Sequence, residues 1–339
     1  MKVESRKKTA FHLSPIPMKI KLSNKLFRWT ILIVCVLFLG WKLAKIDDFS
    51  FFFDNFQNIS TKKAAFLIFA IILFPFNFLV ESCKWKLLLS IFYPITLWKS
   101  IKSILWGQTG AFITPNSIGE FPTRTMNLPA EHRITAISMG FAGSFAQTIA
   151  VSFFGVIAAP IFIYQHLLID KFPNFWTIVI FSVIFSSSIL LFFFFLQKIA
   201  FKVKIKNSAN ARNLLFAFSK FDFIFSLKLI AISTFKYLIF STQFYLILRF
   251  CGVDFSPLQA LVAMPTFYLL LTYTPLFNAV EAAVRASIGV LVFGVFCTNT
   301  AGIIAASVLF WLLNFCIPTI CGLFCANENK TTPTETRRK

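Results

Sequence analysis

Acidic residues are scarce in this 339-residue chain, in which 13 Asp and Glu stand against 33 Lys and Arg and give a formal net charge of +20. Charged residues of both signs make up only 14% of the sequence, whereas hydrophobic residues make up 57%. The bases are confined to particular connecting segments, and no basic face interleaved with aromatic residues is present. We therefore expect no nucleic-acid partner and interpret the excess of bases as the topological signal of a membrane protein.

Motifs for metal, nucleotide and disulfide chemistry are also missing. The seven cysteines include no CxxC pair and lie mostly in apolar runs, where cysteine behaves as a small hydrophobe. His12, His132 and His166 are scattered and lie near no cysteine cluster. The sequence has no long soluble loop, no metal-binding acidic cluster and no glycine-rich nucleotide loop. It therefore predicts no metal site and no cofactor.

Long apolar runs make up most of the chain, whose mean hydropathy is +0.76. Several runs approach or exceed the roughly 20 residues that a helix needs to span a bilayer. We therefore predict an all-α, polytopic helical membrane protein with about six full spans. The first follows a basic segment and lacks a cleavage site, as expected of a signal anchor. The predicted spans lie near residues 29–41, 64–80, 134–163, 175–197, 228–248 and 300–325.

Three basic segments indicate which ends of the spans face the cytoplasm. They are the N-terminal tail (1–26), the connection at 198–228 and the C-terminal tail (326–339). Because Lys and Arg accumulate in cytoplasmic loops, we expect both termini to be cytoplasmic and the protein to reside in a bacterial cytoplasmic membrane. The membrane domain would cover residues 27–325, with one half at about 27–165 and the other at about 175–325.

A polar motif, "TPNSIGEFPTR" (114–124), interrupts a shorter apolar segment near 101–126. Pro115 removes a backbone donor and ends a helix, and Gly119 permits a sharp turn. Asn116 and Ser117 would satisfy the freed backbone groups and cap the half-helix that follows. In hydrocarbon, such non-helical backbone survives only where it is buried in protein or lines a polar cavity.

A second motif, "TPLFNAVEAAVR" (274–285), interrupts the apolar segment near 257–297 and repeats this pattern with Pro275 and Asn278. The predicted topology brings the chain to the two motifs from opposite sides of the membrane. Each segment would therefore form a re-entrant hairpin, and together they would form an inverted repeat with broken helices meeting near the midplane. In transporters that arrangement marks the substrate site.

Each motif also carries a glutamate and an arginine four residues apart, which places both on one helix face. The pairs are Glu120 with Arg124 and Glu281 with Arg285. A charge at the bilayer centre costs about 2.5–3.5 kcal/mol on insertion scales, so such charges are usually functional. Three structural alternatives remain open: intrahelical pairs, cross-pairs that lock the two hairpins together, and charges at interfacial depth. Glu81 is the other clear acidic residue within an apolar stretch.

The first motif resembles that of the lysylphosphatidylglycerol synthase transmembrane-region family, which includes the flippase half of the multiple peptide resistance factor. The family has a proline followed by Gly-Glu and then an arginine, which match Pro115, Gly119, Glu120 and Arg124. The preceding "CKWKLLL" (83–89) is similar to the basic-aromatic helix end of the family.

The second motif keeps Pro275 and Glu281 but has "LFNA" (276–279) where the family is rich in glycine. This departure leaves less room for close backbone approach in the second half of the site. The resemblance covers about residues 27–325. Family members that aminoacylate lipids carry a soluble synthase domain after the membrane part, so we expect that activity to be absent here.

The resemblance implies transport of a phospholipid or lipid-linked headgroup between leaflets, with membrane lipids as the partners. Arg124 and Arg285 would attract a phosphate, while Glu120 and Glu281 would hold an amine or carry a coupling proton. The alternatives are a membrane glycosyl- or phospho-transferase that acts on polyprenyl lipid, and a scaffold subunit without catalytic activity. The candidate substrate-binding residues are Pro115, Asn116, Ser117, Gly119, Glu120, Arg124, Pro275, Asn278, Glu281 and Arg285.

Overall fold

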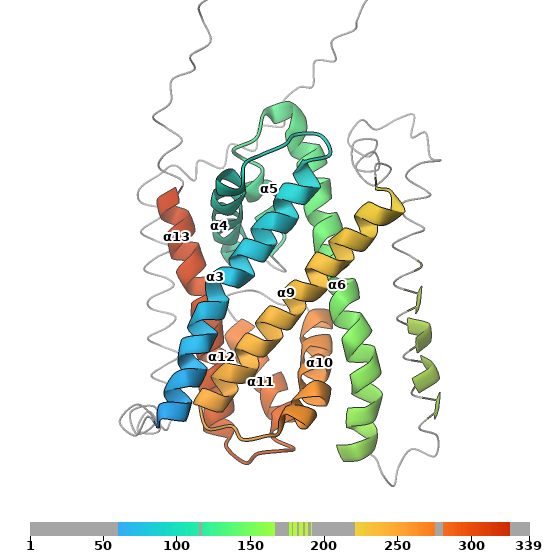
Figure 1. Cartoon of the computed structure of the whole chain (residues 1–339), viewed down its shortest axis with the longest axis vertical. Coiled ribbons are helices and arrows are strands. Elements are labelled where there is room, and N and C mark those ends of the chain that lie inside the picture. The colour runs from blue at the N-terminus through green and yellow to red at the C-terminus, as the bar shows by residue number, and fades with distance from the viewer. Residues whose placement is uncertain are drawn as a thin grey trace, which may run out of the picture.

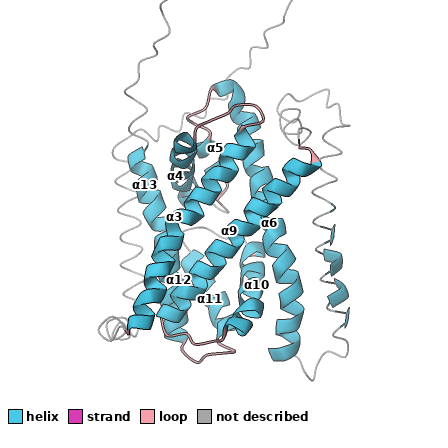
Figure 2. Ribbon diagram, viewed as in Figure 1, coloured by secondary structure: helices cyan, strands magenta, loops and turns pink. Residues whose placement is uncertain are grey.

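The protein is helical throughout the part that its structure, a computed structural model, describes. The described residues are 60–114, 117–166, 221–274 and 281–325, with short pieces between 176 and 191 (Figure 1). They contain helices and connections but no strand (Figure 2). This confirms the predicted all-α class. Both tails, the predicted span near 29–41 and most of the span near 175–197 lie outside the described residues.

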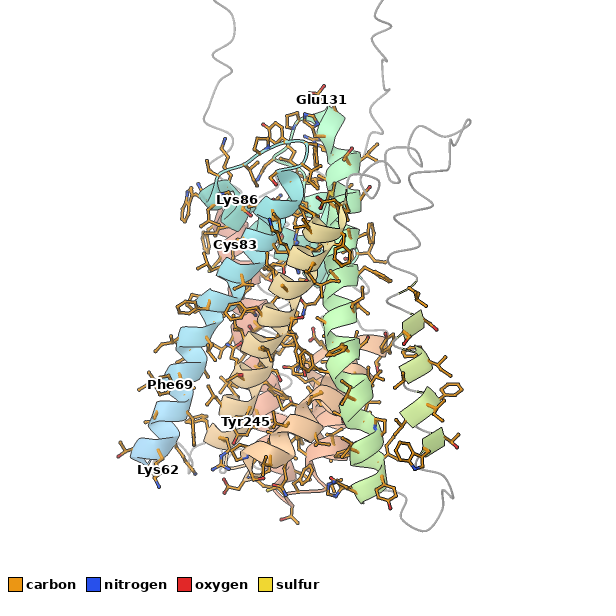
Figure 3. All side chains as sticks on the ribbon, turned by 45° about the vertical axis from the view of Figure 1, so that its right-hand side comes forward. Lys62, Phe69, Cys83, Lys86, Glu131 and Tyr245 are labelled. Atoms are coloured by element: carbon orange, nitrogen blue, oxygen red, sulfur yellow. The ribbon has the colours of Figure 1, made fainter. Side chains whose placement is uncertain are left out.

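Four helical stretches of the described residues are long and apolar enough to cross a membrane, in agreement with four of the predicted spans. They are α3 (Thr61–Leu89), α6 (Ala130–His166), α9 (Phe223–Phe250) and a continuous stack of α12 (Thr300–Trp311), η1 (Leu312–Cys316) and α13 (Ile317–Cys325). Large apolar side chains such as Phe69 point away from the bundle (Figure 3). A lipid environment accounts for such exposure, and the chain is an integral membrane protein.

Two helical hairpins lie between these long helices. The first consists of α4 (Leu97–Ile113) and the short α5 (Glu120–Arg124), and the second of α10 (Pro257–Tyr273) and α11 (Glu281–Phe293). The first hairpin lies at the end of the bundle that holds the end of α3, and the second enters from the opposite end (Figure 1). In the described residues α4 packs against α5 and α10 against α11, as expected of the hairpins that the two motifs predicted.

The described helices form two units of the same design, each with a long helix, a hairpin and another long helix. The opening helices α3 and α9 have 29 and 28 residues, and α4 and α10 have 17 each. Both hairpins break at a threonine, Thr114 or Thr274, and resume at a glutamate, Glu120 or Glu281. Because α3 and α9 run in opposite directions (Figure 1), the second unit is inverted relative to the first.

Side-chain caps determine where several of these helices begin. Thr96 accepts a hydrogen bond from the backbone N–H of Lys99 at the start of α4, and Ser256 forms a capping box at the start of α10. Asp222 accepts from the N–H of Phe225 (2.6 Å). The α9 helix therefore begins at Phe223, inside the 198–228 connection predicted from sequence. A capped start satisfies backbone donors that lipid cannot satisfy.

The break between α4 and α5 is closed by local hydrogen bonds and small residues. The Thr114 hydroxyl accepts from the Gly119 N–H (2.7 Å) and donates to the Gly110 carbonyl oxygen (2.9 Å). A Cβ at Gly110 would lie 2.4 Å from the Gly119 carbonyl oxygen, so only glycine lets α5 pack this closely. Ser117 adopts a left-handed conformation (φ 55°), which side chains rarely tolerate outside constrained or functional sites.

Each hairpin packs against a long helix of the other unit. The first hairpin places α4 beside α13, and the second places α10 beside α6, while α3 crosses α9 directly. Stacked rings of Phe244, Phe267 and Phe293 form the apolar core around the second hairpin. A movement of one unit relative to the other would therefore move both hairpins.

Cysteine labelling can test the inverted orientation. Trp98 and Leu258 occupy the second position of α4 and of α10, and both are exposed. We expect Leu258→Cys to react with an impermeant maleimide added to intact cells, and Trp98→Cys to react only after the membrane is opened, because the basic segments predict that the α4 end faces the cytoplasm. The unmodified chain gives the background from native cysteines. Labelling of both positions from outside would contradict the inverted repeat.

Candidate functional site

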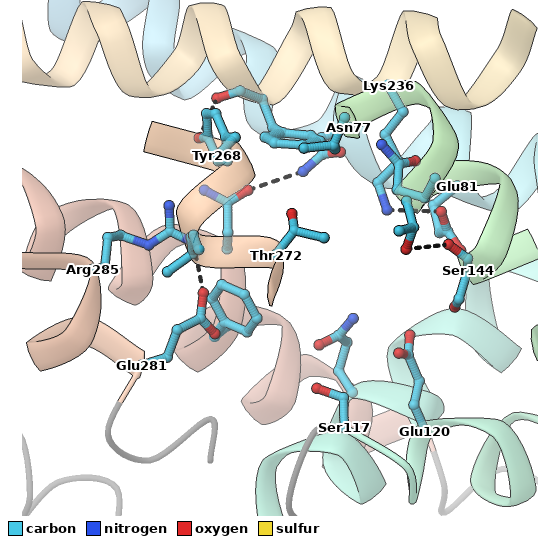
Figure 4. A pocket seen from close by; sticks show the side chains of 18 of the residues that line it. Asn77, Glu81, Ser117, Glu120, Ser144, Lys236, Tyr268, Thr272, Glu281 and Arg285 are labelled. Carbon is cyan, nitrogen blue, oxygen red and sulfur yellow. Dashed lines mark hydrogen bonds and ion pairs between the residues drawn. The ribbon is translucent and has the colours of Figure 1, made fainter. Parts of the chain in front are cut away.

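A cavity of about 690 Å³ lies between the tips of the two hairpins (Figure 4). This volume is typical of a small-molecule site. Ser117, Glu120 and Arg124 line it from the first hairpin, and Glu281 and Arg285 line it from the second. The structure thus brings the two motifs to one place, although about 160 residues separate them.

Five of the ten predicted site residues are not on the cavity wall as described. Gly119 is buried, and its lack of a side chain lets α5 pack closely against α4. Pro115, Asn116, Pro275 and Asn278 lie outside the described residues.

Glu81, near the end of α3, is the centre of a buried ion cluster. One carboxylate oxygen, Oε1, accepts from Arg124 Nη1 (3.0 Å). The other, Oε2, accepts from Lys84 Nζ (2.7 Å) and from Lys236 Nζ of α9 (2.8 Å). One carboxylate therefore joins α3, α5 and α9. Glu81 stands out in the sequence as an acidic residue within an apolar stretch, whereas Lys236 was not predicted. Its signal was a lone base within the apolar run of 228–248.

Arg124 also donates to Glu120, its partner four residues earlier on α5. Its side chain is only 6% exposed and has two carboxylate partners. Of the alternatives left open by the sequence, the intrahelical pair is present, together with a bond to a helix outside the motif. In the described residues no ion pair connects the two hairpins to one another.

Arg285 and Glu281 form the corresponding pair on α11, with Nη2 donating to Oε1 at 2.6 Å. The guanidinium is also enclosed by aromatic rings. Its carbon lies 4.5 Å from the ring centroid of Phe310, and the rings of Phe244, Phe267 and Tyr268 lie at 5.5–5.8 Å. Cation–π attraction of this kind strengthens when water is excluded. Glu281 and the surrounding rings therefore fix the position of the Arg285 side chain.

Amide side chains occupy the cavity wall between the two charged groups. Asn77 Nδ2 donates to Asn314 Oδ1 (3.1 Å), and Asn314 Nδ2 donates to the Phe310 carbonyl oxygen (3.2 Å). Asn314 lies on η1, a π-helical turn, and such turns are frequent at functional sites. Gln147 of α6 donates to the Ser233 carbonyl oxygen of α9 (3.2 Å). These amides were not among the predicted site residues. Their signal in the sequence was an amide side chain within an apolar span.

The cavity carries a positive charge. Four cationic side chains line it in the described structure, against three carboxylates. The cations are Lys84, Arg124, Lys236 and Arg285, and the carboxylates are Glu81, Glu120 and Glu281. Each carboxylate already accepts from a base, which leaves one positive charge for a ligand to neutralise.

Two inverted units, hairpins from opposite ends and a cavity lined by buried charged side chains define a polytopic membrane protein with a central polar site. The chain belongs to the lysylphosphatidylglycerol synthase TM region family, whose model matches residues 27–322. The family associates the chain with lipid-related function in a membrane. Searches of curated proteins and of solved structures found no match.

Variants of the Glu281–Arg285 pair test whether each charge stabilises the fold only together with its partner. Glu281→Gln should lower the free energy of unfolding by about 3–5 kcal/mol, because the buried Arg285 cation loses its carboxylate. The double variant Glu281→Leu/Arg285→Met should recover most of that loss, because no charge remains unpaired. Thermal unfolding in detergent measures the stability of each. A double variant as unstable as Glu281→Gln would contradict this account of the pair.

Proposed function

We propose that the protein moves a phosphate-bearing lipid, either a phospholipid or a lipid-linked headgroup, between the two leaflets of the cytoplasmic membrane. The observation that carries the proposal is the positively charged cavity between two hairpins that enter from opposite ends. A lipid headgroup that crosses the hydrocarbon core needs a polar site within it. The cavity provides that site while the acyl chains remain in lipid.

The inverted design supports alternating access to that cavity. Related units of opposite orientation have two equivalent arrangements, one open to each side, and rocking of one unit against the other exchanges them. Here each hairpin packs on a long helix of the other unit. The Lys236–Glu81–Arg124 bridge crosses from α9 to α3 and α5, so it lies where such rocking would act.

The phosphate is the group that this cavity suits best. Lys236 is the most exposed of the three cations around Glu81, at 22% against 3% for Lys84 and 6% for Arg124. It is therefore the base most available to a phosphate oxygen, in a charge-assisted hydrogen bond. Arg124, which the sequence suggested for this role, has two carboxylate partners and would position the cluster.

Purified protein in liposomes tests the proposal. Lipids labelled on an acyl chain are placed in both leaflets, and an impermeant quencher reads the fraction that remains inside. We expect label to exchange between leaflets with wild-type protein but not in empty liposomes or with a protein inactivated by heat. Formation of a new lipid product would support the transferase alternative instead. Neither exchange nor product would leave a structural subunit as the explanation.

A further inference from the structure

Unpaired hydrogen-bonding atoms in the central cavity indicate the kind of headgroup that it would hold. In the described cavity wall, the Nε atoms of Arg124 and Arg285 and the Nη1 atom of Arg285 have no acceptor, and the buried oxygens Asn77 Oδ1 and Gln147 Oε1 have no hydrogen-bond donor. Both amide residues line the cavity. Their amide orientations are set by the other bonds, since Asn77 Nδ2 donates to Asn314 and Gln147 Nε2 donates to the Ser233 carbonyl. A ligand would therefore have to supply donors to both oxygens.

A phosphate cannot supply them, because an ionised phosphate only accepts. An ammonium group would supply donors, but it would enter a cavity that already has one more cation than carboxylate. No carboxylate of the described wall is free for it, because Glu81, Glu120 and Glu281 are each bound to a base. An added unpaired cation would be repelled by the excess positive charge of the cavity. The donors are thus expected to be uncharged.

Hydroxyl groups meet every one of these conditions, since each can donate and accept without charge. The cavity wall has further hydroxyl and amide side chains that can bond to such a headgroup, including Ser144, Thr272 and Gln108. Figure 4 shows Asn77 and Thr272 between the Glu81–Lys236 cluster on one side and the Glu281–Arg285 pair on the other. A phosphate held by the cluster would place its headgroup along this polar strip.

We infer that the lipid carries an anionic phosphate joined to an uncharged, hydroxyl-rich headgroup, a glycerol or a sugar-like ring, and that lipids with a positively charged amino-acid ester are poor substrates. This inference rests on the proposed function and specifies its substrate. It separates this chain from a transporter of aminoacylated lipid, which would need a free carboxylate in the cavity.

Exchange of four acyl-labelled lipids, each measured with the full chain in liposomes, tests the inference. They are phosphatidylglycerol, phosphatidylinositol, phosphatidylethanolamine and lysyl-phosphatidylglycerol. We expect phosphatidylglycerol, phosphatidylinositol or both to exchange roughly tenfold faster than the two lipids with an amino group. One or two good hydrogen bonds to the hydroxyls, together with repulsion of the ammonium, would account for a difference of this size. Phosphatidylglycerol and phosphatidylinositol distinguish a glycerol headgroup from a ring. Lysyl-phosphatidylglycerol moving as fast as either would overturn the inference while leaving leaflet exchange established.

Binding gives a readout that does not depend on transport. The same four lipids, added to the protein in detergent, should raise its melting temperature most when the headgroup is uncharged and rich in hydroxyls. If no lipid exchanges but this preference appears, the proposed transport fails and the recognition stands. If no lipid exchanges and none binds preferentially, both are wrong.

Two glutamines with similar hydrogen bonds, one inside the cavity wall and one outside it, test which residue recognises the hydroxyl groups. Gln147 and Gln243 each donate to a carbonyl of a neighbouring helix and each have an unpaired buried Oε1, but only Gln147 lines the cavity. Gln147→Met should slow exchange of the preferred lipid by roughly tenfold, and Gln243→Met should leave it near the wild-type rate. Equal effects of the two variants on exchange would contradict hydroxyl recognition by Gln147.

Discussion

Replacing Glu81 with glutamine should destabilise the protein by about 3–5 kcal/mol, the usual cost of breaking a buried ion pair by removing one partner. Glu81 is 8% exposed and accepts from Lys84, Arg124 and Lys236. Without its charge, Arg124 would keep the carboxylate of Glu120, but Lys84 and Lys236 would lose the carboxylate to which they are bonded. Three elements, α3, α5 and α9, would lose the group that joins them. A lower melting temperature in detergent, and less protein in the membrane, are the expected measurements.

Two further variants make this result specific to the cluster. Glu131→Gln removes a carboxylate that is 76% exposed at the start of α6 and should leave the melting temperature almost unchanged. Adding Lys236→Met to Glu81→Gln should recover part of the lost stability, because one unpaired cation is removed with the carboxylate. A Glu81→Gln protein as stable as wild type would show that the cluster does not hold α3, α5 and α9 together.

Lys236→Met should reduce leaflet exchange by roughly 10- to 100-fold, the equivalent of one charge-assisted hydrogen bond of about 1.5–3 kcal/mol. The substitution removes the excess positive charge of the cavity and the cation most exposed to it. The fold should survive, because Glu81 keeps Lys84 and Arg124 as partners. Exchange rates in liposomes and melting temperatures, measured on the same preparation, separate the two effects.

A control on the same helix is available. Lys228 of α9 is exposed and lies outside the cavity wall, so Lys228→Met should exchange lipid at the wild-type rate. Lys236→Arg keeps the charge and should retain more exchange than Lys236→Met, although the larger guanidinium alters the geometry. Wild-type exchange by a folded Lys236→Met protein would remove this lysine, and the phosphate site built on it, from the mechanism.

The elements that sequence analysis predicted well are those whose signal is local. Apolar runs near 64–80, 134–163, 228–248 and 300–325 became long helices because lipid requires every backbone group to bond within its own helix. The helix breaks were predictable for a similar reason. At the break between α4 and α5, the Thr114 hydroxyl accepts from the Gly119 N–H, only five residues further on. Proline alone is a weaker signal, since Pro75, Pro160 and Pro265 lie inside continuous helices.

The candidate site was predictable only in part. A glutamate and an arginine four apart on one helix are bound to face each other, and both pairs did. Their additional partners could not be derived in the same way. Glu81 and Lys236 are separated by 155 residues along the chain, and Asn77 and Asn314 by 237. These pairs cannot be read from the sequence, because they depend on how the fold packs α9 and η1 against α3.

The sequence by itself thus determined the class of the protein, the positions of its helices and the two hairpins, because hydrophobicity, capping and charge bias act on neighbouring residues. Only the tertiary structure decided that Arg124 is neutralised by two carboxylates, that Arg285 is enclosed by aromatic rings, and that Lys236 is the most exposed base of the Glu81 cluster. The reason is that the availability of a buried charge depends on every charge and ring that the fold places around it. Those neighbours come from helices that are distant in sequence.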